Sequence, residues 1–208
     1  MKQMAERGKF IVFEGLDHSG KTTQAKIFAG WLNASGVPAV CTFEPTDDSV
    51  PGRAARDVIR KKISLHAEAA ALLFVADRFE HVMNFILPNL ERGVTVVSDR
   101  FYLSNVAYQG LGVDTDVLLA LNEMIIAKKI RPDATIFLDV PPEECLERIR
   151  RDSPQKDLFD ELDTLAAVRE NYLAAFGRVS EKIIILDAAG LDVEAAAEKI
   201  FSGLRKIS

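Results

Sequence analysis

The chain has 208 residues, of which 48% are hydrophobic and 27% charged, and its formal net charge at pH 7 is −5. This composition is ordinary for a globular protein, and the length suits one compact domain better than two. A surface of this charge repels nucleic acid and anionic membranes, so a site for a polyanionic ligand has to gather its positive charge locally.

Short runs of apolar and β-branched residues alternate along the chain with longer segments of helical periodicity. The run at 10–13 predicts a strand, followed by a glycine-rich turn and a helix over about 21–33. Further strands are predicted at 39–43, 94–97, 134–140 and 182–186. Further helices are predicted after residues 44–47 and at 67–90, 114–128, 142–151, 160–176 and 192–204.

The helix at 67–90 carries apolar residues at helical spacing, which we expect to face the core: Leu72, Leu73, Val75, Phe79, Val82, Met83 and Ile86. Continuously apolar strands separated by helices predict a parallel sheet buried on both faces. With right-handed crossovers this becomes a doubly wound α/β fold that binds ligands outside the carboxyl ends of its strands. Without repeats, low-complexity tracts or long linkers, we expect residues 1–208 to form a single domain.

The two cysteines, Cys41 and Cys145, lie far apart and lack the spacing of metal ligands, which favours reduced thiols in a reducing compartment. Residues 1–9 are polar and lack the apolar core of a secretory signal. No apolar run approaches the roughly 18 residues needed to cross a bilayer. These features predict a cytoplasmic protein.

Residues 15–22 match the phosphate-loop pattern G-x-x-x-x-G-K-[ST] at every fixed position. Glycines allow backbone N–H groups to surround phosphate oxygens, and the following helix directs its positive end to the same place. Lys21 can reach the β- and γ-phosphates, and Thr22 is placed to ligate Mg²⁺. The match lies between a strand and a helix, as this chemistry requires. The predicted ATP-binding residues are Gly15, Leu16, Asp17, His18, Ser19, Gly20, Lys21, Thr22 and Thr23.

The loop motif alone does not separate kinases from other nucleotide-binding proteins. The sequence has no N-K-x-D segment of GTPases and no L-S-G-G-Q-type signature of transport ATPases. Leu16 and Asp17 stand where partition ATPases carry an early lysine. These differences favour a small kinase that binds its acceptor in the same domain.

Four segments, in this order and spacing, resemble the thymidylate kinases among the P-loop nucleoside monophosphate kinases. They are F-E-G-L-D at 13–17, E-P-T-D at 44–47, L-F-V-A-D-R at 73–78 and S-D-R-F-Y-L-S-N-V-A-Y-Q-G at 98–110. The resemblance implies transfer of the γ-phosphoryl group of ATP to dTMP, with Mg²⁺, giving dTDP and ADP for dTTP biosynthesis. It also implies a homodimer packed through helices such as the one carrying Phe74. We predict five parallel strands in the order 2-3-1-4-5.

Arginine, lysine and aspartate side chains would handle the phosphates. The resemblance implies that Arg100 grips the acceptor phosphate, since a guanidinium offers two parallel donors and keeps its charge. Arg56, after the Glu44–Pro45 turn, matches a phosphate-contacting arginine; Arg53 could replace it, and a solvated surface arginine is the alternative. Asp99 ends a buried strand and can hold the Mg²⁺ shell, or instead cap the next helix.

The resemblance places the base and sugar on two segments. Phe74 would stack on thymine, a plain core phenylalanine being the alternative, and Arg78 would hydrogen-bond a base carbonyl. Asn105 would read the Watson–Crick edge, because its amide both donates and accepts. Tyr108 would lie under the sugar and disfavour a 2′-hydroxyl. The other implied acceptor-site residues are Asp17, near the 3′-hydroxyl, and Glu44, Pro45, Ser104 and Gln109.

Residues 148–157 are basic, polar and interrupted by proline, which favours a mobile lid over about 148–160. Some thymidylate kinases carry a catalytic arginine directly after the loop aspartate, where this chain has His18. The resemblance therefore assigns charge stabilisation to a lid arginine, Arg151 first and Arg150 second. The alternative is a solvated basic helix end.

Several positions depart from the family pattern. Phe101 replaces the usual tyrosine, the turn lacks R-E-P-G-G, and the lid lacks D-R-x-E. A related kinase for dUMP, CMP or a deoxynucleoside is the second hypothesis. A nucleotide-switched module without an acceptor site is the third, but it would not need the residues that the resemblance assigns to the base.

Overall fold

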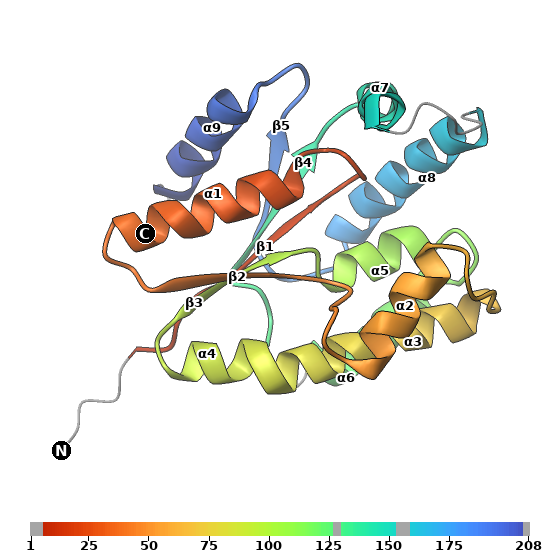
Figure 1. Cartoon of the computed structure of the whole chain (residues 1–208), viewed down its shortest axis with the longest axis horizontal. Helices are drawn as coiled ribbons and strands as arrows, with labels where there is room; N and C mark the ends of the chain where they lie inside the picture. Colours follow the sequence, from red (N-terminus) through yellow and green to blue (C-terminus); the bar gives the residue numbers. More distant parts are fainter. Residues whose placement is uncertain (1–5, 127–129, 153–158, 206–208) are drawn as a thin grey trace.

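The computed structural model describes residues 6–126, 130–152 and 159–205 (Figure 1). At its centre lies a parallel sheet of five strands in the order β2-β3-β1-β4-β5. The strands are β1 (Phe10–Gly15), β2 (Ala39–Phe43), β3 (Thr95–Asp99), β4 (Ala134–Asp139) and β5 (Ile183–Asp187). The predicted doubly wound α/β class and strand order are therefore confirmed.

Helices cover both faces of the sheet (Figure 1). They are α1 (Lys21–Ala34), α2 (Val50–Ile59), α3 (Ala67–His81), α4 (Leu87–Glu91), α5 (Tyr102–Gln109), α6 (Thr115–Ile126), α7 (Pro142–Asp152), α8 (Phe159–Phe176) and α9 (Val193–Arg205). Helices α1 and α9 pack together on one face, and α5 and α8 pack together on the other. No helix within the described ranges is long and apolar enough to cross a membrane.

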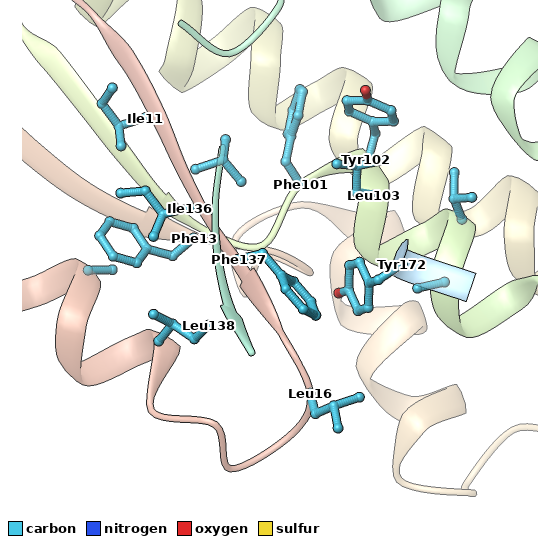
Figure 2. Close-up of a cluster of buried hydrophobic side chains, with 14 of the residues drawn as sticks. Ile11, Phe13, Leu16, Phe101, Tyr102, Leu103, Ile136, Phe137, Leu138 and Tyr172 are labelled. Atoms are coloured by element: carbon cyan, nitrogen blue, oxygen red, sulfur yellow. The ribbon is translucent and has the colours of Figure 1, made fainter. Parts of the chain in front are cut away.

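The apolar strands form the core because successive side chains point to opposite faces. Phe13 packs against Phe28 of α1, whereas Phe10 packs edge-on against Phe101, which precedes α5. On β4, Phe137 contacts Tyr172 of α8. Figure 2 shows Phe137 and Tyr172 across the strands from Phe13. This double burial holds the carboxyl ends of β1 and β3, where Gly15 and Asp99 lie, in fixed positions.

The predicted helix at 67–90 is interrupted. A π-helical turn, Val82–Ile86, separates α3 from α4, and Pro88 near the start of α4 supplies no backbone donor. The helix α5 was not predicted separately, because its residues were interpreted only as a motif. Strands β1 and β3 extend further toward their carboxyl ends than the apolar runs did, since Glu14, Ser98 and Asp99 are polar yet buried.

The predicted inward face of 67–90 is confirmed in part. Val82 and Ile86 are buried and Val75 and Phe79 pack against the core, but Leu72 and Met83 are 51% and 39% exposed. In addition, α3 turns Asp77, Arg78 and His81 inward. Each is hydrogen-bonded there, as burial of polar groups requires. The inward side of α3 therefore combines apolar core residues with polar side chains that are hydrogen-bonded behind the predicted acceptor site.

Candidate active site

The phosphate loop joins β1 to α1 and needs glycine at both of its fixed positions. Gly15 has φ 148°, and a Cβ atom there would lie 2.7 Å from Ser19 Oγ and 2.8 Å from the Leu138 carbonyl oxygen. Gly20 stands directly before α1 with φ 96°, in the left-handed region. The loop thus curls tightly beneath the positive end of α1, where anions bind.

Lys21 is buried, and its Nζ donates to the carbonyl oxygen of Leu16 at 2.5 Å. Desolvation, with a contribution from the nearby Arg100 charge, lowers the pKa of Lys21 to about 8. Aspartates 17 and 99 and Glu14 act in the opposite direction. A phosphate placed on this loop would restore the charged form, so the lysine is poised to respond to the ligand.

Thr22 and Asp99 meet at the carboxyl end of β3. The Thr22 hydroxyl donates to Asp99 Oδ2, while the buried Asp99 Oδ1 has no hydrogen-bond partner among the described residues. Across those residues, no group of three or more histidine, cysteine or acidic side chains could hold a metal alone. Mg²⁺ bound with a nucleotide needs only one or two protein oxygens, since phosphates and water supply the others. The hydroxyl and orphaned carboxylate oxygen therefore fit Mg²⁺.

A cavity of about 670 Å³ opens over the loop. Its described lining includes four basic residues, Lys21, Arg100, Arg148 and Arg151. The Arg148 guanidinium donates to the His18 carbonyl oxygen at 3.0 Å and to Glu144 at 2.5 Å. The overall acidic chain thus gathers positive charge at one place, which suits a polyphosphate.

Arg148 had no assigned role in the sequence, although it lies one helical turn before Arg151 and shares its face of α7. Arg150 does not appear in the described lining of the cavity and is exposed. Within the predicted lid, residues 153–158 lie outside the described residues. The structure thus brings Arg148 and Arg151 to the phosphate cavity.

A second, smaller cavity of about 150 Å³ adjoins the first through Asp17 and Arg100, which line both. Its lining contains every residue predicted for the acceptor except Arg56. The lining residues are Asp17, Glu44, Pro45, Ile59, Phe74, Arg78, Arg100, Phe101, Ser104, Asn105, Tyr108 and Gln109. Ile59 carried no sequence signal beyond its place at the end of α2. Residues from all four motif segments therefore meet, with Ile59, at one small cavity.

Arg56 lies against the Glu44–Pro45 turn instead of the cavity. It pairs with Asp47 at 2.5 Å, donates to the Pro45 carbonyl oxygen at 2.6 Å and lies over the Phe43 ring. The alternative Arg53 donates to the Asp48 carbonyl oxygen at 2.7 Å. In this structure Arg56 supports the turn that carries two of the lining residues.

Arg100 is held at the junction of the two cavities. Its backbone has φ 75°, and its guanidinium donates to Ser104 Oγ at 3.0 Å, pairs with Asp17 and lies 4.9 Å from the centre of the Tyr108 ring. Although desolvation opposes it, the neighbouring Tyr108 and Asp17 raise the pKa of Arg100 well above its usual value. The Asp17 pKa is lowered, since Arg100 and Lys21 outweigh desolvation. The cation is thus permanent and fixed in place.

Glu14 explains why the backbone around Arg100 is fixed. Its buried carboxylate accepts hydrogen bonds from the backbone N–H groups of Phe101 and Ser104, at 2.9 and 3.2 Å, at the start of α5. Its other oxygen accepts from the Ser104 hydroxyl at 2.5 Å and the Tyr172 hydroxyl at 2.9 Å. Burial raises the pKa of Glu14 despite these contacts. Neither residue was predicted for the site: Glu14 entered only as part of the F-E-G-L-D motif, and Tyr172 lies on α8, 158 residues away in sequence.

A third cavity, of about 400 Å³, adjoins the loop on its other side and is lined by residues of the loop, α1, α7 and the segment after β5. Ala188, which follows β5, lies in its wall together with Leu138 and Val193. Gln24 also lines this cavity, donating to the Val193 carbonyl oxygen at 2.8 Å. The three cavities therefore follow one another across the carboxyl edge of the sheet.

Comparison with known proteins gives a consistent result. The family model described as thymidylate kinase matches residues 13–200. A probable thymidylate kinase of Pyrococcus horikoshii is 40% identical over 172 residues, which cover 80% of this chain and 82% of that protein. One from Thermococcus kodakarensis is 39% identical over 93% of this chain and 95% of its own. The thymidylate kinase of Pelotomaculum thermopropionicum is 37% identical, with coverage of 96% and 97%.

Proposed function

Because the chain belongs to the thymidylate kinase family and is therefore a phosphotransferase, we propose that it moves the γ-phosphoryl group of ATP to the 5′-phosphate of dTMP. The products are dTDP and ADP. The observation that carries this proposal is the pair of adjoining cavities, one lined by basic residues and one by Phe74, Arg78 and Asn105, with Arg100 lining both.

The donor lies on the phosphate loop in this proposal. Backbone N–H groups after Gly15 bind the β- and γ-phosphates, and Lys21 neutralises the charge between them. Adenine occupies the third cavity, beside Ala188. Thr22 and Asp99 hold Mg²⁺, which supplies charge neutralisation to the phosphate oxygens when it is bound. The loop and lysine also keep the γ-phosphorus directed toward the junction of the cavities.

The acceptor occupies the smaller cavity, with its phosphate on Arg100. The fixed guanidinium orients one phosphate oxygen for in-line attack, so the reaction needs positioning and charge stabilisation but no covalent enzyme intermediate. Phe74 stacks on the base, and Tyr108 lies under the sugar. Asp17 pairs with Arg100 in this structure and receives the 3′-hydroxyl when the nucleotide binds.

We assign the developing charge on the transferring group to Arg151, which lines the phosphate cavity from α7. Residues of about 148–160 act as a lid that excludes water during transfer. The kinase domain spans residues 1–208 in this proposal. Because ATP and dTMP are cytoplasmic metabolites, the cytoplasm is the proposed place of action.

We propose that the protein is a homodimer. The exposed apolar residues of α3 and of the π-helical turn after it include Leu72 and Met83. Exposed apolar side chains gathered along one helix favour association, because burying them removes apolar surface from water.

A panel of acceptors tests the function. Turnover with ATP and Mg²⁺ is measured for dTMP, dUMP, dCMP and thymidine, and dTMP should give the highest kcat/KM. A higher value for dCMP or for the nucleoside would contradict the assigned acceptor. Titration of dTMP without ATP should show saturable binding, which a nucleotide-switched module would lack. Lys21→Ala should abolish turnover while retaining this binding, because the lysine lines the cavity over the phosphate loop and is not among the described lining residues of the smaller cavity.

A further inference from the structure

Three helices meet behind the acceptor cavity, and a buried asparagine joins them. Asn122 of α6 is 0% exposed and lies between Arg78 of α3 and Asn105 of α5. Its Oδ1 accepts a hydrogen bond from Arg78 at 2.7 Å, and its Nδ2 donates to Asn105 Oδ1 at 2.9 Å. Asn122 is not among the described lining residues of the cavity, whereas Arg78 and Asn105 are. It therefore contacts the cavity only through these two side chains.

The chemistry of the partners determines how both amides are turned. Arginine can only donate, so the atom of Asn122 that faces Arg78 has to be the carbonyl oxygen. The amide nitrogen of Asn122 then donates both to Asn105 and to the Leu118 carbonyl oxygen, at 2.8 Å. Asn105 consequently presents Oδ1 to Asn122, and its Nδ2 donates to Gln109 Oε1 at 2.9 Å. Neither amide is free to reverse without losing hydrogen bonds.

The other side of Arg78 is equally constrained. Its Nε donates to Glu44 Oε2 at 2.8 Å, and a terminal nitrogen donates to the Phe101 carbonyl oxygen at 3.2 Å. Glu44 in turn lies 3.0 Å from His81 Nδ1. Arg78 is 2% exposed, so these contacts have little competition from water. Arg78 is thus a fixed donor at one end of the chain of hydrogen bonds. It sets the orientation of the Asn122 amide, and that amide in turn sets the orientation of the Asn105 amide.

We propose that Asn122 is a positioning residue that sets the base preference of the kinase, by holding the Asn105 amide in the orientation that suits thymine and opposes cytosine. This inference rests on the proposed function, in which the base lies beside Arg78 and Asn105. Thymine presents an accepting C4 carbonyl and a donating N3–H group, whereas cytosine presents a donating amino group and an accepting N3. The two edges are opposite, so reversal of one amide exchanges which base it suits.

Asn122→Asp reverses that amide selectively. Aspartate still accepts from Arg78, but it has no proton to donate to Asn105, which has to turn its Nδ2 toward the new carboxylate. Whichever atom of Asn105 reads thymine, its opposite then takes that place. We expect the ratio of kcat/KM for dTMP to that for dCMP to fall roughly tenfold or more, the size of one reversed buried hydrogen bond, with KM for ATP unchanged.

Asn122→Leu gives a second variant with the same branched shape and the same number of heavy atoms. It removes the hydrogen bonds to both neighbours, so the Asn105 amide can take either orientation, and we expect a smaller fall in the same ratio. Both acceptors are measured on one preparation, and the ratio is therefore independent of the fraction of folded enzyme. Loss of stability alone would lower both rates equally and leave the ratio unchanged.

Asn89→Asp is the matched control. Asn89 is also a buried asparagine, 8% exposed, and it donates to the Phe85 carbonyl oxygen and accepts from Arg92, outside the described linings of the nucleotide cavities. It should keep the wild-type ratio. If Asn122→Asp and Asn122→Leu also keep that ratio while the wild type prefers dTMP, the inference is overturned and the proposed function stands. A wild type without activity on dTMP would instead refute the function.

Discussion

Single buried side chains determine the direction of the groups that would touch the nucleotides. Arg100 stands in a left-handed backbone conformation, and the Glu14 carboxylate accepts from the backbone N–H groups of Phe101 and Ser104 at the start of α5. The same carboxylate receives the Ser104 hydroxyl, whose oxygen accepts from Arg100. A change at Glu14 should therefore act on the acceptor site through Arg100, without touching a ligand.

Glu14→Gln tests this positioning. Glutamine keeps one accepting oxygen for the backbone of α5. Its amide nitrogen donates toward the hydroxyls of Ser104 and Tyr172, and it thereby competes with Arg100 for the Ser104 oxygen. We expect KM for dTMP to rise several-fold and the free energy of unfolding to fall by about 1–3 kcal/mol, the cost of a mispaired buried polar group. Steady-state kinetics and urea unfolding measure the two effects.

Tyr172→Phe serves as its control, since it removes one hydroxyl and keeps the ring packing against Phe137. Its effect on KM for dTMP should be smaller than that of Glu14→Gln. An unchanged KM in a stably folded Glu14→Gln variant would show that the carboxylate supports folding alone.

The lowered pKa of Lys21 predicts proton uptake on ATP binding. In the free protein the lysine is largely neutral at pH 9, because burial lowers its pKa from 10.5 to about 8. The phosphates favour the charged form, so binding a non-hydrolysable ATP analogue at pH 9 should take up about one proton, and far less at pH 7. Calorimetry in two buffers of different ionisation enthalpy measures the uptake.

Lys21→Met should remove this uptake. The unfolded chain binds more protons than the folded one between pH 8 and 10.5, so the free protein should also gain stability from this group as the pH rises through that window. Equal proton uptake by the wild type and the Lys21→Met variant would exclude Lys21 as the titrating group.

At the scale of elements, helix α7 presents its basic residues unequally to the phosphate cavity. Arg148 and Arg151, one turn apart, line it, whereas Arg150 points elsewhere on the helix. Because a helix has 3.6 residues per turn, residues three or four apart share a face, whereas neighbours in sequence point in different directions. The face of α7, more than the number of its arginines, should decide which of them acts in catalysis.

Arg151→Ala should therefore lower kcat by about 10²–10³-fold, equivalent to about 2.7–4 kcal/mol of lost charge stabilisation in the transition state, with little change in KM for ATP. Arg150→Ala is the matched control from the same helix and should remain within a few-fold of the wild type. Single-turnover kinetics separates the chemical step from product release. If the Arg151→Ala variant had the single-turnover rate of the wild type, Arg151 would be excluded from the mechanism.

At the scale of the whole molecule, α3 lies between the smaller cavity, which Phe74 and Arg78 line, and the outside of the protein, where Leu72 is exposed. The inner side supports the acceptor cavity through Asp77, Arg78 and His81. The outer side leaves Leu72 exposed, and Met83 of the π-helical turn that follows is exposed as well. A monomer would keep this apolar surface in water, so covering it by a second copy is favourable.

Leu72→Asp combined with Met83→Asp should convert the proposed dimer to a monomer, because two carboxylates would be buried against apolar neighbours. Size-exclusion chromatography with light scattering gives the mass directly. Val37→Asp, at an exposed valine in the loop before β2, should leave the mass unchanged. A wild type that is already monomeric at micromolar concentration would contradict the dimer.

Much of the architecture could be predicted from local sequence. The phosphate loop is a contiguous segment, and the spacing of its glycines, lysine and threonine is what allows it to bind phosphate. Apolar runs predicted the strands because buried parallel strands tolerate few polar residues. The order of the sheet and the residues of the acceptor cavity followed from motifs in a particular order. Those residues do converge on one cavity, although their individual roles remain predictions.

What the sequence alone determined was therefore the fold, the loop and most of the residues that line the smaller cavity. Only the tertiary structure decided that Arg56 supports a turn, that α3 buries Asp77, Arg78 and His81, and that Glu14, Arg148 and Asn122 contact residues of the two cavities. The physical reason is the distance in sequence over which each kind of interaction acts. Helical and strand periodicity are local, whereas Glu14 and Tyr172 meet across 158 residues, and such pairings arise only when the packed core brings distant polar groups together without water.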